Sequence, residues 1–306
     1  MPKHPFIEAL LLRLAGMPSL SEGTPQQGRN LIAAGRDALG KGPDMHRTLD
    51  LALPSRGGSL PARLHVPVAD PMGIVVYLHG GGWVLGSIDD FDTLGRTLAA
   101  RSGCAVLLPD YRLAPEHPFP AALHDTEDAV HYLMTHGSEL LGRPLPIVIA
   151  GDSAGANLGT VAARTLRGAA DIVLQVLIYP VADCDFDRPS YLAHGQGLPL
   201  TIQDMAWFFD LYAPRDRWSD PQISPMRAND LVGLPPALVI TAEYDVLESE
   251  GRAYSERLSA DGVKVDFRCI PGVPHGFIRL HNLFEVADRE VSAIADAIAQ
   301  ACKSHG

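Results

Sequence analysis

The sequence predicts an α/β fold, with a mostly parallel eight-stranded sheet, helices on both faces and a small helical cap. From about Thr48 onward, short apolar runs alternate with stretches of helical spacing. This alternation is typical of βαβ units and of a sheet that helices bury on both sides. The 306 residues are also 46% hydrophobic, which is enough for a large core. Folds of this class and size often form one domain.

Eight apolar runs have the length of strands. They cover residues 49–53, 62–66, 74–78, 105–108, 147–150, 172–178, 237–241 and 265–270. No helical pattern separates the first two, so we expect them to pair as an antiparallel hairpin. The later runs are mostly separated by helical stretches, which favours parallel pairing. The expected helices cover residues 91–101, 121–134, 154–166, 251–260 and 283–301.

Two segments do not follow the alternation. Residues 1–45 precede the first strand and contain helical stretches broken by glycine and proline, and residues 184–230 form a long insertion with an aromatic helical patch at 205–212. Long insertions at one end of a sheet are usually functional. We therefore expect residues 1–45 to form the N-terminal part of a cap. Residues 46–306 then form the main catalytic domain, with the cap insertion at about 184–230.

Composition and charge exclude several classes of partner. The formal net charge is −11, so nucleic acid is not an expected partner. The four cysteines are scattered without a C-x-x-C pair, which favours neither a metal site nor a redox site. The N-terminal apolar run is interrupted by Glu8 and Arg13, unlike a secretion signal. No stretch approaches the ~20 apolar residues of a membrane span. We expect a soluble cytoplasmic protein without membrane partners, metal or cofactor.

The segment Gly151-Asp152-Ser153-Ala154-Gly155 matches the pattern G-x-S-x-G. It directly follows the predicted strand at 147–150 and opens the predicted helix at 154–166. A tight strand–turn–helix of this kind presents a serine as a nucleophile. An ordinary turn with the serine as a helix cap is the alternative. The context favours Ser153 as a nucleophile.

The segment His79-Gly80-Gly81-Gly82-Trp83 follows the predicted strand at 74–78. Consecutive glycines let a backbone approach a substrate with its N–H groups exposed, and such groups stabilise the negative charge that develops on a carbonyl oxygen. We predict an oxyanion hole formed by Gly81, Gly82 and Ala154. A phosphate-binding loop is disfavoured, because neither of its common glycine patterns is present.

The general base and the acid that orients it follow from chain order. In this arrangement the order is serine, acid, histidine. His275 lies in a turn directly after the predicted strand at 265–270, whereas His281 begins a helical stretch and His305 is next to the C-terminus. We therefore predict His275 as the base. The predicted acid is Asp245, which follows the strand at 237–241, with Asp183 and then Glu243 as alternatives.

With these residues assigned, the sequence resembles the hormone-sensitive-lipase-like esterases, the bacterial family IV group of the α/β-hydrolase fold with the GDSAG motif. The resemblance runs from about residue 79 to beyond 277. It includes HGGGW at 79–83, DYRLAPE at 110–116, FPAA at 119–122, GDSAGAN at 151–157 and HGF at 275–277. It implies the triad Ser153, Asp245 and His275, the same oxyanion donors, a cap, no cofactor and, in some relatives, a homodimer that pairs through the last strand. After the acid the family tends to read DPLRDEG, whereas this chain has DVLESEG at 245–251.

These observations predict a serine carboxylesterase that hydrolyses short- to medium-chain acyl esters through an acyl-enzyme. An amide or formamide hydrolase with the same triad is the first alternative. A non-catalytic small-molecule receptor is the second, and the complete triad argues against it. Aromatic residues at the cap and after the glycine turn are expected to contact substrate: Trp83, Trp207, Phe208 and Tyr212.

Overall fold

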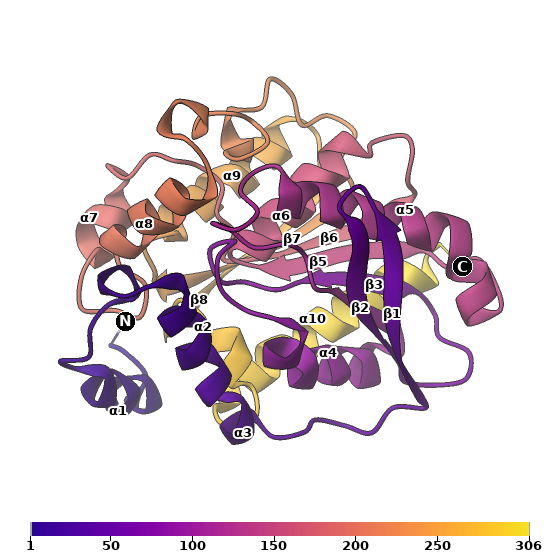
Figure 1. Cartoon of the computed structure of the whole chain (residues 1–306), viewed down its shortest axis with the longest axis horizontal. Helices are drawn as coiled ribbons and strands as arrows, with labels where there is room; N and C mark the ends of the chain where they lie inside the picture. Colours follow the sequence, from indigo (N-terminus) through magenta and orange to yellow (C-terminus); the bar gives the residue numbers. More distant parts are fainter. Residues whose placement is uncertain (1, 306) are drawn as a thin grey trace.

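The computed structural model describes residues 2–305 and contains one eight-stranded sheet (Figure 1). The strand order is β1-β2-β4-β3-β5-β6-β7-β8. The strands are β1 (Arg47–Ser55), β2 (Gly58–Val66), β3 (Ile74–Leu78), β4 (Ala105–Pro109), β5 (Ile147–Asp152), β6 (Ile172–Ile178), β7 (Ala237–Tyr244) and β8 (Val265–Pro274). β2 is antiparallel to β1 and β4, and all other pairs are parallel. The predicted α/β class and the antiparallel start are confirmed.

Helices cover both faces of the sheet, as Figure 1 shows. α4 (Ile88–Ser102) and α10 (Glu285–Lys303) pack together on one face. α5 (Ala121–Leu141), α6 (Ala154–Thr165) and α9 (Glu248–Ala260) cover the other. Alternate residues of each strand point to opposite faces. On β5, for example, Ile149 belongs to the core beneath α5 and α6, and Val148 belongs to the core beneath α4 and α10.

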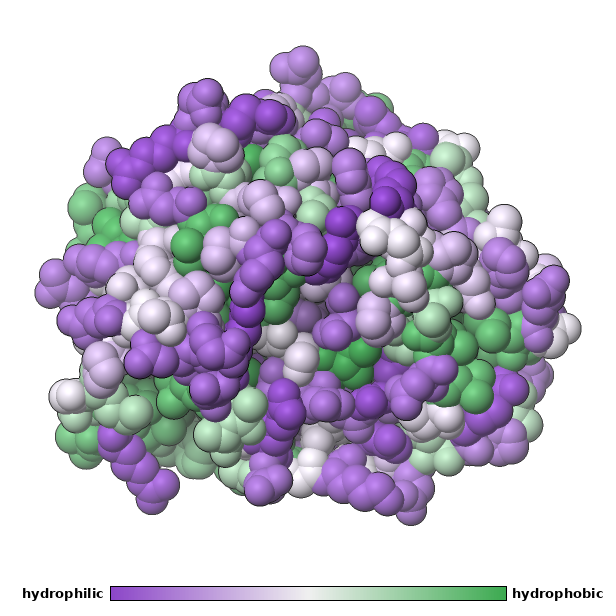
Figure 2. All heavy atoms as spheres, viewed as in Figure 1, coloured by the Kyte–Doolittle hydropathy of each residue, from purple (hydrophilic) through white to green (hydrophobic). Residues whose placement is uncertain are grey.

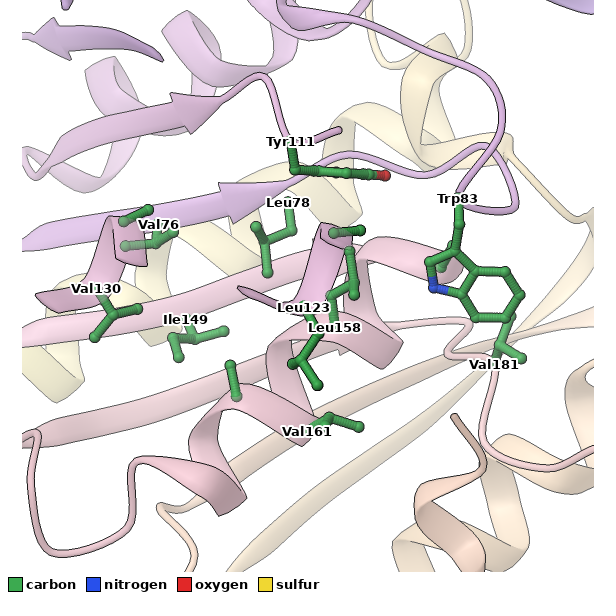
Figure 3. Close-up of a cluster of buried hydrophobic side chains, with 14 of the residues drawn as sticks. Val76, Leu78, Trp83, Tyr111, Leu123, Val130, Ile149, Leu158, Val161 and Val181 are labelled. Carbon is green, nitrogen blue, oxygen red and sulfur yellow. The ribbon is translucent and has the colours of Figure 1, made fainter. Parts of the chain in front are cut away.

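The core between the sheet and helices α5 and α6 extends as far as the carboxyl ends of the strands. Figure 3 shows Val76, Leu78 and Ile149 of the sheet facing Leu158 and Val161 of α6. Trp83 lies further along the same cluster and is completely buried. Close packing of this kind fixes the loops that follow β3 and β5.

The remaining helices lie at the carboxyl end of the sheet, on the left in Figure 1. The N-terminal segment contains α1 (Pro5–Leu14), η1 (Leu20–Glu22), α2 (Pro25–Ala34) and α3 (Arg36–Leu39). The insertion contains α7 (Pro189–His194), α8 (Ile202–Tyr212), η2 (Arg215–Arg217) and η3 (Pro225–Arg227), and a further short helix, η4 (Phe277–Leu280), follows β8.

One carboxylate joins the N-terminal segment to the insertion. Asp204 Oδ2 accepts the Thr201 N–H at 3.0 Å, which caps α8, and Asp204 Oδ1 accepts the Ser21 N–H at 2.8 Å. Capping satisfies a free donor at the helix start. α8 and η1 are therefore fixed to each other by a residue in the first turn of α8.

Polar and apolar residues are mixed on the face in Figure 2, with an apolar region over α1 at the lower left. Leu12 of α1 is 77% exposed. Within residues 2–305, no helix has the length and hydrophobicity needed to cross a membrane.

Candidate active site

The turn between β5 and α6 carries Ser153 at the carboxyl end of the sheet. Ser153 has φ 55° and ψ −120°, a conformation that residues with side chains rarely adopt. Its N–H donates to the carbonyl of Ile178 at 2.8 Å. A Cβ atom on Gly155 would lie 1.9 Å from the Leu78 carbonyl oxygen, and one on Gly151 would lie 2.6 Å from the Gly155 carbonyl carbon. Close backbone packing thus requires both glycines of the motif.

A hydrogen-bonded chain joins Ser153 to Asp245. His275 Nε2 lies 3.1 Å from Ser153 Oγ, and His275 Nδ1 lies 2.6 Å from Asp245 Oδ2. A carboxylate can only accept, so Nδ1–H donates to Asp245 and Nε2 is left to accept the serine proton. The Asp245 side chain is fully buried, and its Oδ1 accepts the Leu247 N–H at 3.0 Å. This arrangement suits proton transfer from serine to histidine.

The two alternative acids belong to other networks. Asp183 accepts from Arg188 Nη2 at 2.6 Å and from Arg227 Nε at 2.7 Å. Burial alone would raise the pKa of Asp183, but these two hydrogen bonds outweigh it and lower the pKa. Glu243 accepts a backbone N–H of β8 at 2.7 Å. The His275 Nδ1 forms its hydrogen bond with Asp245 and with neither of these two acids.

The glycine-rich turn after β3 lines the same pocket as Ser153. The Gly80 N–H donates to Asp152 Oδ1 at 2.9 Å. Gly81 and Gly82 have φ 123° and 60°, values that glycine adopts without steric cost. Within residues 2–305, the N–H groups of Gly81, Gly82 and Ala154 have no hydrogen-bond acceptor. Free donors held in this way can stabilise an oxyanion.

Buried side chains hold this turn in place. Asp152 also accepts from Tyr77 Oη at 2.9 Å. Burial raises the pKa of Asp152, although the hydrogen bond from Tyr77 opposes the rise. The His79 ring packs against Tyr111 and Phe91, with centroids 4.3 and 5.2 Å away. Burial lowers the pKa of His79, which favours a neutral ring that packs and hydrogen-bonds within the turn.

A pocket of about 130 Å³ lies over Ser153. Its apolar lining consists of Leu20, Ile32, Leu85, Phe91, Val181, Pro199, Leu200, Met205 and Phe208. A cavity of about 150 Å³ in another protein holds one benzene molecule. The pocket therefore has room for one small apolar group.

Of the aromatic residues expected to contact substrate, the pocket lining includes Phe208. A Cβ atom on Gly82 would lie 2.2 Å from the Phe208 ring, so Phe208 packs directly on the glycine turn. Trp83 is completely buried and stacks on Tyr212 with a centroid distance of 4.3 Å. Trp207 lies beside Phe208 on α8, with ring centroids 5.1 Å apart. Trp83, Trp207 and Tyr212 thus support the wall of the pocket from outside its lining.

The pocket lining includes residues that the sequence motifs do not indicate. Leu20 and Ile32 come from the N-terminal segment, and Met205 comes from α8. Met205 lies three residues before Phe208, so the helical period places both on one face. That spacing was a usable signal. Nothing in the sequence marks Leu20 or Ile32, because their role depends on how the N-terminal segment folds over the sheet.

Asn157 of α6 has a role that the motif alone did not reveal. Its Nδ2 donates to the carbonyls of Val181 at 2.9 Å and Ile223 at 2.8 Å. These two carbonyls lie near the start and the end of the insertion. The helix that begins directly after Ser153 therefore holds both ends of the segment above it. An amide side chain among the small and apolar residues of the first turns of α6 was the available signal.

Metal-ligating side chains are not gathered at this site. Within residues 2–305, no group of three or more histidine, cysteine, aspartate or glutamate side chains could hold a metal ion. The four cysteines are free, and the Cys104 and Cys302 sulfur atoms lie 3.7 Å apart in the core beneath α4 and α10.

Comparison with known proteins gives consistent results. Residues 75–279 match the alpha/beta hydrolase fold family. The chain is 38% identical over 271 residues to ethyl acetate hydrolase of Pseudomonas putida, covering 85% of each protein. It is 40% identical over 256 residues to the carboxylic ester hydrolase LipN of Mycobacterium tuberculosis, covering 79% of this chain and 67% of that protein. Among solved structures, a hyperthermophilic esterase from the archaeon Pyrobaculum calidifontis superposes with a TM-score of 0.93 at 37% identity, over 98% of this chain and 99% of that one.

Proposed function

Because this chain belongs to the α/β-hydrolase fold family, in its hormone-sensitive-lipase-like group, and is a carboxylic ester hydrolase, we propose that it hydrolyses short- to medium-chain acyl esters with Ser153, His275 and Asp245 as its triad. The observation that carries the proposal is the hydrogen-bonded chain from Asp245 through His275 to Ser153, which ends in a small apolar pocket. One relative is named ethyl acetate hydrolase, which also supports a small substrate for this chain.

The reaction has two halves. Ser153 Oγ attacks the ester carbonyl carbon while His275 Nε2 takes the hydroxyl proton, and the oxyanion accepts hydrogen bonds from Gly81, Gly82 and Ala154. The proton then passes to the leaving alkoxide, the alcohol departs and the acyl group remains on Oγ. In the second half, a water molecule gives its proton to His275 and attacks the acyl carbon. The acid leaves as the proton returns to Ser153. Asp245 stabilises the imidazolium throughout.

The size of the pocket supports a limit on chain length. Each buried methylene contributes about 0.8 kcal/mol until the end of the pocket is reached, after which further methylenes clash or stay in water. With a volume of about 130 Å³, the pocket fills with a short chain. We expect activity to be highest for acyl chains of about two to eight carbons and to fall steeply beyond about ten.

The test is a panel of p-nitrophenyl esters with increasing acyl length, assayed with the wild-type protein and Ser153→Ala. Loss of the nucleophile should lower kcat by roughly 10⁴- to 10⁶-fold while the protein remains folded. Mass spectrometry of the quenched wild-type reaction should find the acyl group on the peptide that contains Ser153. A folded Ser153→Ala variant that keeps a tenth of the turnover would exclude this nucleophile. Preference for long-chain triacylglycerols would exclude the short-chain substrate.

We also propose that residues 1–45 and about 184–230 act together as a cap on a catalytic domain formed by the rest of residues 46–306. The contact of Ser21 with Asp204, and the presence of Leu20, Ile32 and Phe208 in the pocket lining, support this division. The four free cysteines support a cytoplasmic location, because thiols persist in a reducing compartment.

We further propose a homodimer that pairs through β8. This strand lies at the end of the strand order, and an unpaired edge is a template for pairing with a second chain.

A further inference from the structure

Arg279 places a positive charge on the wall of the otherwise mostly apolar pocket. It lies on η4, four residues after His275, and is the one lysine or arginine among the lining residues. The guanidinium lies over the Phe91 ring, 4.7 Å from its centroid, and Phe91 lines the pocket as well. The charge therefore belongs to the same cavity as Ser153.

Within residues 2–305, no carboxylate forms an ion pair with Arg279. Its Nη2 donates to the backbone carbonyl of Asp90 at 3.2 Å, and its Nε is buried with no hydrogen-bond partner. The Asp90 carboxylate is held by Arg36 Nε at 2.7 Å. The other nearby acid, Asp152, also lines the pocket and accepts from the Gly80 N–H and from Tyr77 Oη, both at 2.9 Å. Both neighbouring carboxylates thus hydrogen-bond to other groups, and Asp152 acts on Arg279 through its charge without forming an ion pair.

A partly buried guanidinium without a hydrogen-bonded carboxylate is costly, because the Phe91 ring and the Asp90 carbonyl offset only part of the desolvation of its charge and its N–H groups. Guanidinium groups bind carboxylates with two parallel hydrogen bonds, which are roughly twice as strong as neutral ones. A substrate carboxylate that enters the pocket would supply an acceptor for the terminal N–H groups of the guanidinium, since Nε itself is buried. The same pocket offers an uncharged ester no such gain.

We propose that Arg279 is a specificity-determining residue that selects esters carrying a second, free carboxylate, such as the monoesters of short dicarboxylic acids. The inference rests on the proposed function, because the ester carbonyl must lie at Ser153 while the distant carboxylate binds Arg279. The inference specifies the chemical class of the substrate, in addition to the proposed limit on acyl chain length. The apolar residues of the lining contact the methylenes between the two groups, and Arg279 binds the far end.

The first test uses the wild-type protein alone. Mono-p-nitrophenyl glutarate carries the charge on the acyl side, and its methyl ester is the uncharged match. 4-Acetoxybenzoate and its methyl ester place the charge on the alcohol side. We expect kcat/KM to favour the charged member in one of the two pairs, at about 0.15 M salt to screen the net negative charge of the protein. A preference of more than tenfold for the methyl ester in both pairs would overturn the inference.

The second test compares Arg279→Met, Arg279→Lys and the control Arg143→Met. The measured quantity is the ratio of kcat/KM for the charged ester to that for its uncharged match, so the intrinsic reactivity of each ester cancels between variants. Arg279→Met should lower this ratio by about 10- to 100-fold, the size expected for lost hydrogen bonds to a charged group. Arg279→Lys should retain part of it, because the charge remains. The Arg143 side chain is 45% exposed and pairs with Asp70 on the surface. Arg143→Met should therefore leave the ratio of the two kcat/KM values unchanged.

The outcomes separate the inference from the function on which it rests. If no ester of either pair is hydrolysed, the proposed function fails. If both members are hydrolysed and Arg279→Met lowers both rates equally, Arg279 acts by holding Phe91 and the Asp90 carbonyl, and the inference is wrong. A fall in the ratio alone supports substrate recognition. Because the wild-type comparison does not depend on a variant that folds, it decides the matter if Arg279→Met is unstable.

Discussion

The Ser153 hydroxyl reaches His275 from a backbone at φ 55°, a conformation that the two motif glycines make possible. Strain of this kind persists where the surrounding structure enforces it. At the other end of the hydrogen-bonded series, Asp245 fixes the orientation of the His275 imidazole. Because it is fully buried and hydrogen-bonded twice, its geometry leaves one tautomer available to the histidine.

Replacing the acid tests this role. Asp245→Asn should lower kcat by about 10⁴-fold, because the amide favours the wrong imidazole tautomer. Asp183→Asn is the matched control: Asp183 is also buried, yet it pairs with two arginines away from the imidazole. Steady-state kinetics on one short ester, with circular dichroism to verify folding, gives both values. A larger loss in Asp183→Asn than in Asp245→Asn would transfer the role to Asp183.

Chain order and motif spacing were sufficient to propose each residue of the Ser153–His275–Asp245 chain, because each directly follows a strand that the sequence marks clearly. Arg279 shows what could not be predicted. Four residues after His275, an arginine suggests a solvated surface side chain. Its position in the pocket depends on the turn of η4 and on Phe91, which is distant in the sequence.

At the scale of elements, the buried strands were predicted closely because their apolar runs are continuous, and β3 and β6 have the predicted bounds. β8 is longer than predicted. Its last residues, 271–274, include two prolines and a glycine, which normally end a strand. The pairing of β7 with β8 shifts register between Ala242 and Tyr244, and an edge strand tolerates proline and glycine at such an irregularity.

α9 is joined to the start of the insertion by a buried acid. Glu250 Oε1 accepts the N–H groups of Ala182 at 2.7 Å and Asp183 at 3.3 Å. Burial raises the pKa of Glu250 to about 8. Between its usual range and this value, the folded protein keeps a proton that the unfolded chain releases. Folding stability from this group is therefore complete at low pH and is lost as the pH rises toward 8.

Glu250→Gln removes that titration. The free energy of unfolding of the wild type, minus that of the variant, should decrease between pH 5 and pH 8 by up to about 1.4 kcal/mol per pH unit. Urea unfolding at pH 5, 6.5, 8 and 9 measures the difference, in which all other titrating groups cancel. A difference independent of pH would mean that Glu250 is ionised in the folded protein throughout.

The side chain of Phe208 on α8 should limit acyl length. Phe208→Ala enlarges the pocket, so the ratio of activity on ten-carbon to four-carbon esters should rise about tenfold, at a cost in stability of roughly 3–5 kcal/mol. Trp207→Ala is the control, since Trp207 is the neighbouring aromatic residue and does not line the pocket. An equal change in both variants would indicate a general loosening of α8. No change in Phe208→Ala would show that another residue closes the pocket.

At the scale of the molecule, segments far apart in sequence form the site. Ser21 and Asp204 are 183 residues apart and hydrogen-bonded, and their neighbours line one pocket with Ser153. A sequence pattern identifies the apolar face of such a segment. It does not show which other part of the protein packs against that face. The presence of two helical segments outside the strand–helix alternation was predictable for this reason, while the individual residues that line the pocket were not.

The proposed dimer can be tested at this scale. Light scattering should give twice the 32.8 kDa mass of the chain. The Lys264 carbonyl accepts from Ala237 of β7, so alternation along the strand directs the Cys269 N–H to the free edge. Cys269→Pro removes that donor and should yield the monomer, whereas Cys269→Ser keeps it and should remain dimeric. A monomeric wild type at all accessible concentrations would contradict the proposal.

The two hydrogen bonds of Asn157 have a consequence for how this protein can change. They hold the carbonyls of Val181 and Ile223 to one helix, so the ends of the chain between them are already brought together. For a loop whose ends are fixed, doubling the length costs only about 0.6 kcal/mol of closure entropy. Insertions, deletions or whole replacements between these anchors should thus leave Ser153 in place. Because the Asn157 amide holds both ends, the segment between Val181 and Ile223 can be replaced without moving Ser153. Selection can therefore change the substrate range of the protein while the reacting groups keep their positions.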